Sequence, residues 1–212
     1  MQHIFVYGDS LSWGIVPNTR QRFPFDVRWP GAMEKRLNAN GPRVRVTEDC
    51  VNGRRTVWDD PFKPGRNGLV GLGARIEAQS PIALLILMLG TNDFQFNHVY
   101  NNAQTSALGI AALVNEIRRA PIEPGMPVPP ILIACPPPMQ KPGGQVGLKF
   151  HGAEERSKGL AAAYEETGKS LGCSFFDAGN VTQSSRVDGI HLDEDQHLTL
   201  GAAIADFVAA LL

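Results

Sequence analysis

Apolar residues fall along the chain in two alternating patterns. Residues 82–89 and 131–135 are apolar throughout and have the length of a strand, which is typical of strands buried on both faces of a parallel sheet. Residues 4–7 form a similar run. Residues 43–47 alternate valine with arginine, so this segment is expected to be a strand with one less buried face, such as one near a sheet edge. A short fifth strand is expected over residues 174–176.

Between these runs, apolar residues recur at the spacing of amphipathic helices. The clearest case is residues 105–120, in which four large aliphatic side chains share one face. Asp193 followed by Gln196 matches a capping box and predicts the start of a last helix. The other helices are expected over residues 31–38, 68–79 and 152–171.

Strands and helices therefore alternate five times, which predicts an α/β fold with a parallel sheet between two layers of helices, a three-layer α/β/α sandwich. The chain has no internal repeat or change of composition, so one domain over residues 1–212 is expected. A flavodoxin-like strand order 2-1-3-4-5 fits five strands by analogy of fold. This order would place the end of the first strand beside the switch point where such sheets bind ligands.

Composition narrows the choice of partners. The 20 Lys and Arg residues nearly balance the 21 Asp and Glu residues, and the net charge of −1 does not favour nucleic acid or an anionic membrane as a partner. No apolar run reaches the roughly 20 residues that span a bilayer, and no basic leader precedes the first strand. Since the three cysteines lack metal or redox spacing, we expect reduced thiols in a cytoplasmic protein: Cys50, Cys135 and Cys173.

A serine follows the first predicted strand directly, in the sequence Gly8-Asp9-Ser10. Because ligands bind at the carboxyl ends of strands in open α/β sheets, Ser10 is placed like a nucleophile. Asp and Ser are also the usual residues that cap a helix, and this stretch alone favours the capping role.

Polar groups follow other strand ends as well. Gly53 comes after the second predicted strand, Asn92 after the third, and Asp188 and His191 lie just before the last helix. Acyl transfer needs a nucleophile, a base, an anion that orients the base, and hydrogen-bond donors for the oxyanion. With Ser10, these segments offer one of each.

His191 differs from the other four histidines because it alone has both a carboxylate three residues earlier and a glycine between the two. Asp188 can fold back onto one ring nitrogen and leave the other free to face Ser10. The simpler interpretations remain open at this point: Asn92 as a loop residue that caps a turn, and Gly53 as a turn glycine.

The motifs at residues 8–11, 53, 90–93 and 188–191 resemble the four blocks of the GDSL or SGNH hydrolases, in the order of that family and over nearly the whole chain. Within the family, the chain is most similar to the bacterial arylesterase and acyltransferase group. Six further segments are similar to that group: residues 26–29, 59–61, 66–68, 88–93, 136–138 and 176–179.

The resemblance implies that Ser10 is the nucleophile, His191 the base and Asp188 its orienting partner. It implies an oxyanion hole formed by Ser10, Gly53 and Asn92, and neither a metal nor another cofactor. Cys50 stands near the second block, where the family often has a glycine. The expected activity is hydrolysis of short-acyl aryl or alkyl esters through an acyl-enzyme, and transfer of the acyl group to another alcohol is expected as a second outcome of the same intermediate.

The resemblance also implies a homo-oligomer, with residues 48–67 and 136–150 in the subunit contacts. The expected partner is a small-molecule ester. Side chains beside the motifs are expected to line an apolar pocket for the substrate: Leu11, Trp13, Thr91, Phe94 and Ile190.

Three alternatives stay open on the sequence. The first is a carbohydrate acetylesterase with the same machinery. The second is a non-catalytic flavodoxin-like binding module. The third is a metal-dependent phosphoesterase with these ligands: Asp9, Asn92, Asp93, Asp188 and His191.

Overall fold

Five strands form one parallel sheet in the computed structural model, which describes residues 1–40 and 43–212. The order is β2-β1-β3-β4-β5, and each neighbouring pair is parallel. The predicted α/β class and the flavodoxin-like strand order are therefore confirmed. The strands are β1 (Gln2–Gly8), β2 (Val44–Cys50), β3 (Leu84–Met88), β4 (Ile131–Cys135) and β5 (Ser174–Asp177).

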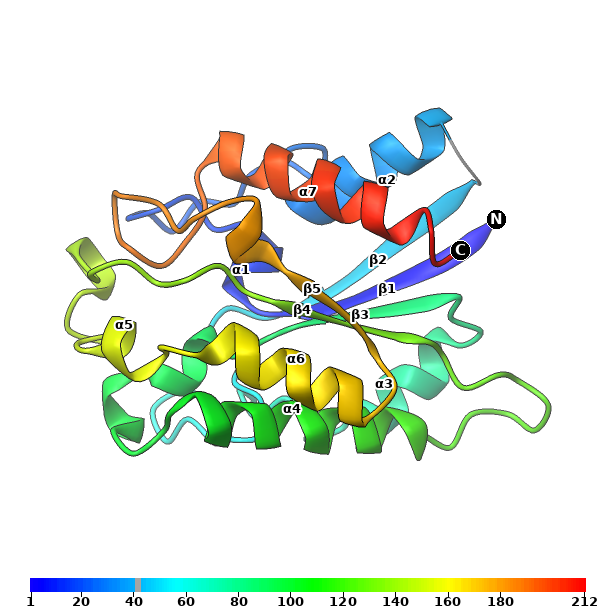
Figure 1. Cartoon of the computed structure of the whole chain (residues 1–212), viewed down its shortest axis with the longest axis horizontal. Coiled ribbons are helices and arrows are strands. Elements are labelled where there is room, and N and C mark those ends of the chain that lie inside the picture. Colours follow the sequence, from blue (N-terminus) through cyan, green and yellow to red (C-terminus); the bar gives the residue numbers. More distant parts are fainter. Residues whose placement is uncertain (41–42) are drawn as a thin grey trace.

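Helices cover both faces of this sheet (Figure 1). On one face lie α2 (Trp29–Asn40) and α7 (Glu194–Val208), and on the other lie α3 (Leu72–Gln79), α4 (Ala103–Arg118) and α6 (Leu160–Ser170). Shorter turns connect them: α1 (Ser10–Trp13), η1 (Thr91–Phe94), η2 (Phe96–His98), η3 (Gly144–Val146), α5 (Ala153–Arg156) and η4 (Ala178–Asn180).

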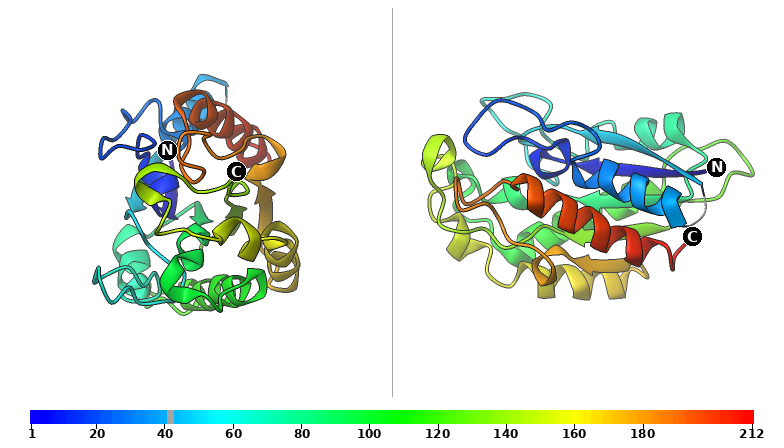
Figure 2. Two further views of the ribbon diagram at one scale, coloured as in Figure 1. Left: turned by 90° about the vertical axis from the view of Figure 1, so that its left-hand side faces the viewer. Right: turned by 90° about the horizontal axis from the view of Figure 1, so that it is seen from above.

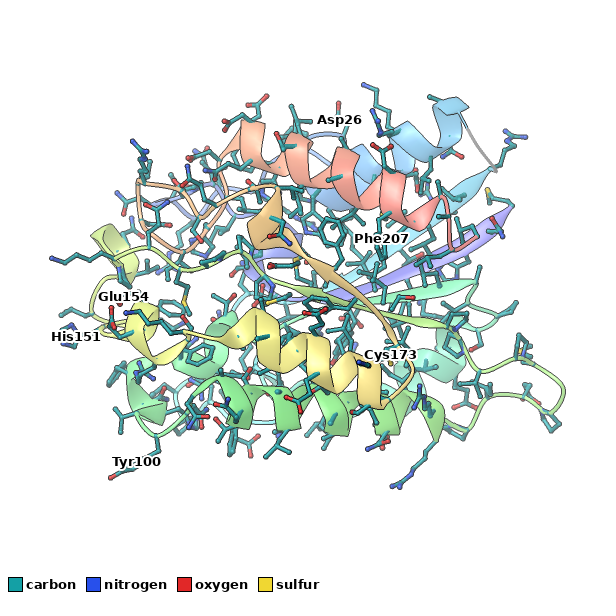
Figure 3. The ribbon with its side chains drawn as sticks, viewed as in Figure 1. Asp26, Tyr100, His151, Glu154, Cys173 and Phe207 are labelled. Carbon is teal, nitrogen blue, oxygen red and sulfur yellow. The ribbon has the colours of Figure 1, made fainter. Side chains whose placement is uncertain are left out.

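The sheet separates two apolar layers. Along β1, Ile4 and Val6 pack into the layer of α2 and α7, whereas Phe5 and Tyr7 pack into the layer of α3, α4 and α6. Burial on both faces removes the need for alternating polar residues and explains why these strands read as continuous apolar runs. At the outer strand, Phe207 of α7 packs against Phe176 of β5 with ring centroids 5.5 Å apart (Figure 3).

Two predicted helices differ from the structure, and a glycine explains each difference. The predicted helix over residues 152–171 is divided into α5 and α6, because Gly159 adopts a left-handed conformation with φ of 84°. The predicted helix over residues 68–79 begins only at Leu72, since Gly71 is left-handed as well. The capping box of Asp193 and Gln196 is present at the start of α7, as predicted.

The long connection after β2 is held to the carboxyl end of the sheet by buried polar groups. Asp93 accepts hydrogen bonds from the Thr56 backbone N–H at 2.9 Å and the Thr56 hydroxyl at 2.8 Å. Arg54 donates to the Gly8 carbonyl at 3.1 Å and lies 3.9 Å from the centroid of the Tyr7 ring. These contacts fix the loop that bears Gly53 beside the end of β1. Within the described residues, no helix combines the length and the apolar character that crossing a bilayer requires.

Candidate active site

Residues from four separate segments meet at the carboxyl ends of the strands, the end that faces the viewer on the left of Figure 2. Ser10, Gly53, Asn92, Asp188 and His191 all line one pocket with a volume of about 150 Å³. The strand order explains this convergence, since β1 and β3 are neighbours and the connections after them leave the sheet at the same edge.

Asp9 and Ser10 divide the two roles that the sequence left open. Asp9 caps α1, because its carboxylate accepts the Leu11 N–H at 2.9 Å. Ser10 is the first residue of α1, and its hydroxyl makes no hydrogen bond to any described residue. The capping role therefore belongs to Asp9, and the serine hydroxyl is free at the pocket.

Asp188 folds back onto His191. One carboxylate oxygen lies 2.7 Å from His191 Nδ1, and the other accepts the backbone N–H groups of Ile190 and His191 at 3.0 and 2.9 Å. Gly189 makes the turn with φ of 78°, and a Cβ there would lie 2.5 Å from the carbonyl oxygen of Lys141. The backbone N–H of Asn18, which the sequence reasoning missed, donates to the same carboxylate at 3.2 Å.

These hydrogen bonds determine the charge of Asp188. Burial alone would raise the pKa of this carboxyl group, but the bonds from His191 and Ile190 outweigh burial and lower the pKa to about 2. Asp188 is therefore a carboxylate over the pH range in which a histidine titrates. A bond to Nδ1 leaves Nε2 as the ring nitrogen that can accept a proton from the pocket.

Ser10 and His191 line the same pocket without a hydrogen bond between them in the described structure. Such contacts are often long or poorly aligned in enzymes without substrate and shorten when substrate binds. Both groups are nearly buried, with 5% of Ser10 and 7% of His191 exposed, so each opens only toward the pocket.

Asn92 is held by a chain of buried hydrogen bonds. Its Nδ2 donates to Asp9 at 2.8 Å, and its Oδ1 accepts from Gln95 Nε2 at 2.7 Å. Gln95 Oε1 in turn accepts from the Arg55 guanidinium at 2.6 Å. An arginine can only donate, and a carboxylate only accepts. The Arg55 guanidinium and the Asp9 carboxylate at the two ends of this series of hydrogen bonds therefore fix the orientation of the Gln95 and Asn92 amides. One N–H of Asn92 is left for a ligand.

Gly53 lies in the loop after β2 with φ of 88°, and its backbone N–H donates to no described group. The backbone N–H of Ser10 has no partner within α1, because the first turn of a helix leaves its donors unpaired. The pocket therefore offers up to three N–H donors. Cys50 ends β2 and does not line the pocket.

The residues expected to line an apolar pocket lie elsewhere. Leu11, Phe94 and Ile190 are almost fully buried in the two apolar layers, where neighbours of a strand end fill the core rather than the cleft. Thr91 lines a different pocket, and Trp13 lies under the Arg22 guanidinium at 4.7 Å.

The lining that replaces them is mixed in character. Loop residues after the strands provide three apolar and three cationic side chains: Ile15, Val146, Phe150, Arg20, Lys63 and Lys149. Val146, Lys149 and Phe150 come from residues 136–150, the segment that the sequence analysis expected at subunit contacts. The sequence could not predict which loop side chains face the pocket, because loops lack the periodic pattern of apolar residues that helices and strands have.

The five ligands proposed for a metal do not all face one site: Asn92, Asp188 and His191 line the pocket, whereas Asp9 and Asp93 do not. Asp93 faces the protein interior, where Thr56 and Ser106 donate to its carboxylate, and Asp9 is occupied by Leu11 and Asn92. Within residues 1–40 and 43–212, no three His, Cys, Asp or Glu side chains are grouped so that they could hold a metal ion.

Residues 6–201 match the model of the GDSL-like lipase/acylhydrolase family. The chain belongs to this family. It is a carboxylic ester hydrolase, and four sequence motifs spread over the chain had already indicated this class. Among curated proteins the sequence has no significant match.

Solved structures of the family are similar over the full length of both chains. The inhibitor-bound aryl esterase of M. smegmatis is 34% identical with a TM-score of 0.93, and both chains are covered completely. A carbohydrate acetylesterase from Sinorhizobium meliloti is 33% identical with a TM-score of 0.92, and a putative arylesterase from Agrobacterium tumefaciens is 35% identical with a TM-score of 0.90, again with complete coverage of both chains.

The low pKa of Asp188 predicts how this GDSL hydrolase loses stability in acid. A carboxyl group whose pKa falls from 3.8 to about 2 on folding stabilises the protein above pH 4 by about 2 kcal/mol, and this contribution disappears as the pH falls through 2. Asp188→Asn is expected to lower the free energy of unfolding at pH 6 by at least that amount, and the difference from the native protein should shrink toward pH 2.5. Urea unfolding at a series of pH values measures both.

Glu166→Gln, which removes an exposed carboxylate of α6, provides the matched control and should leave the pH dependence nearly unchanged. A cost of Asp188→Asn that is the same at pH 6 and pH 3 would contradict this account of the charge.

Proposed function

We propose that this enzyme hydrolyses short-acyl aryl or alkyl esters through an acyl-enzyme on Ser10. The observation that supports the proposal is the meeting of a free serine hydroxyl, a histidine oriented by a buried carboxylate and an oriented amide donor at one small pocket. These are the parts that acyl transfer requires.

In the proposed mechanism, His191 Nε2 removes the proton of the Ser10 hydroxyl as the oxygen attacks the ester carbonyl. Asp188 keeps the other ring nitrogen protonated and stabilises the imidazolium that forms. The oxyanion receives hydrogen bonds from Asn92 Nδ2 and from the backbone N–H groups of Ser10 and Gly53. His191 then returns the proton to the departing alcohol, and water releases the acyl group.

The size of the pocket supports short acyl chains. A volume of about 150 Å³ with Ile15, Val146 and Phe150 in its wall suits a small apolar acyl group. The likeness to the aryl esterase of M. smegmatis supports aryl esters as substrates. Transfer of the acyl group to an alcohol in place of water belongs to the same proposal, because a second alcohol can approach the acyl-enzyme along the path by which the first one left.

A carbohydrate acetylesterase is the second candidate, favoured by the likeness to the enzyme from Sinorhizobium meliloti and by the polar side chains in the pocket wall. Turnover of an aryl acetate and of an acetylated xylo-oligosaccharide, compared as kcat/KM, distinguishes the two candidates.

We further propose that the enzyme is a cytoplasmic homo-oligomer. Phe62 and Leu148, which lie in the two segments expected at subunit contacts, are 78% and 91% exposed. Tyr100 also projects from the surface and is 92% exposed (Figure 3). Surfaces that bind another protein are typically rich in exposed apolar side chains grouped in a contiguous patch, and these exposed residues are candidates for such a patch. The three free thiols suit a reducing compartment.

Sedimentation velocity at micromolar protein concentration tests the oligomer. We expect a species larger than the 23.0 kDa chain, and we expect Leu148→Asp to shift it toward the monomer because a charge would then be buried at the contact. A native protein that sediments only as a monomer would refute the proposal.

An organophosphonate is expected to react once per chain, at Ser10, because its phosphorus mimics the tetrahedral intermediate of ester hydrolysis. Peptide mass spectrometry locates the adduct. Ser10→Ala should prevent labelling and abolish ester turnover, whereas EDTA should leave turnover intact. An adduct on any peptide other than the one that contains residues 8–11 would overturn the assignment of the nucleophile.

Asn92→Ala is expected to lower kcat by roughly a hundredfold, the usual effect of removing one oxyanion donor. Gln95→Glu tests the chain that orients Asn92. The carboxylate would still pair with Arg55, but it cannot donate to Asn92 Oδ1, so the Asn92 amide loses its fixed orientation. We expect kcat to fall roughly tenfold with little change in KM.

Asn97→Ala is the matched control, because Asn97 also accepts from Arg55, at 3.0 Å, but makes no hydrogen bond to Asn92 among the described residues. Urea unfolding of each variant separates loss of orientation from loss of folding. Equal kcat values for the Gln95→Glu and Asn97→Ala variants would contradict a positioning role for Gln95.

A further inference from the structure

Three cationic side chains from separate loops line the pocket that contains Ser10. They are Arg20, Lys63 and Lys149. None of the three makes an ion pair or a side-chain hydrogen bond to another described residue. The wall of the pocket thus bears three positive charges that the protein itself does not neutralise by direct contact.

The nearby carboxylates are already in use. Asp60 lies 3.3 Å from the buried guanidinium of Arg55, and Asp188 lies 2.7 Å from His191. Asp188 is also the only acidic residue among the pocket-lining residues that the structure describes. The charges that face the pocket therefore sum to a net positive value, although the chain as a whole has a net charge of −1.

The three cations are close enough to repel one another. Burial lowers the pKa of Lys149, and Lys63, Arg55 and Arg20 lower it further against the opposing effect of Asp60. Burial, then the charge of Arg66 and then that of Arg20 lower the pKa of Lys63, and Asp60 opposes them. Holding like charges together in a partly desolvated wall is unfavourable, and a bound anion would relieve this repulsion.

Lys149 and Arg66 both lie close to Gly53, a member of the predicted oxyanion hole. A Cβ built on Gly53 would lie 3.9 Å from Lys149 Nζ. Arg66 is equally near, but its guanidinium already donates to the carbonyl groups of Asn52 and Pro64, each at 2.9 Å. Lys149 is half-buried and donates to no described group, so its ammonium can bind a ligand.

We propose that the preferred substrates are esters that bear a carboxylate close to the scissile carbonyl, bound by Lys149 together with Lys63 and Arg20. The inference rests on the proposed attack by Ser10 in this same pocket. An ammonium provides a point charge, and the guanidinium of Arg20 can hold a carboxylate by two parallel hydrogen bonds. The carboxylate can belong to the acyl group or to the alcohol, and paired substrates separate these two sources.

The test compares kcat/KM for matched anionic and neutral esters. 4-Nitrophenyl hemisuccinate against 4-nitrophenyl butyrate places the charge on the acyl group. 4-Acetoxybenzoate against 4-acetoxybenzamide places it on the alcohol. After correction for the alkaline hydrolysis rate of each ester, we expect a preference of at least roughly tenfold for the anionic member of one pair.

Lys149→Gln is expected to reduce this preference about fivefold, and 0.5 M salt should reduce it as well, since the Debye length then falls well below 10 Å. Lys169→Gln is the matched control. Lys169 is an exposed lysine near the end of α6, just before β5 begins. It therefore lies at the amino ends of the strands, whereas the pocket lies at their carboxyl ends. The control variant should keep the native preference.

The outcomes separate this inference from the proposed function. If Ser10-dependent turnover is present but the preference is absent, or is the same for the Lys149→Gln variant, the inference is overturned and the esterase mechanism stands. If neither ester pair is turned over in a Ser10-dependent way, the mechanism fails. In that case, calorimetry with succinate and succinamide still tests the anion site. Tighter binding of succinate than of succinamide, weakened in the Lys149→Gln variant, supports the anion site. Equal binding of the two compounds refutes it.

Discussion

One buried carboxylate joins the two halves of the candidate site. Asp9 accepts the Leu11 N–H with one oxygen, which starts α1 and presents Ser10, and accepts Asn92 Nδ2 with the other. Burial raises the pKa of Asp9 to about 6, although its hydrogen bonds and nearby His191 oppose the shift. The Asp9 carboxylate therefore fixes the positions of both Ser10 and the Asn92 amide. Neither residue can move without breaking a buried hydrogen bond, and an unpaired buried polar group is costly.

The fold could be predicted because its signals are periodic or local. Residues 82–89 and 131–135 are apolar throughout because both sheet faces are buried, and the capping box at Asp193 needs only residues within one turn of helix. The prediction of one helix over residues 152–171 was wrong because of Gly159. A single left-handed glycine divides a helix without changing the apolar spacing around it. The fold of Asp188 onto His191 was also local, because three residues and a glycine suffice to close that turn.

The rest of the site could not be read in the same way. Gln95 and Arg55 act on Asn92 through contacts that exist only after the loop following β2 has packed against the end of β3. The pocket wall comes from loops, where no period indicates which side chain faces inward. The positive charge of the pocket wall could not be predicted from the sequence either. A net charge of −1 is a sum over the whole chain and does not reveal three positive charges gathered at one pocket.

A positive pocket wall has two distinct effects on an esterase. A carboxylate on the substrate is charged in the ground state and in the transition state alike, so its attraction to Lys149 strengthens both and acts mainly through KM. The oxyanion exists only in the transition state, so an ammonium close to Gly53 would also favour that charge and raise kcat for neutral and anionic esters together. In the proposed mechanism the three N–H donors act on the oxyanion directly, whereas Arg20, Lys63 and Lys149 are the lysine and arginine side chains among the described pocket-lining residues and are free to pair with a carboxylate. The cations should therefore influence which ester binds more than how fast a bound ester reacts.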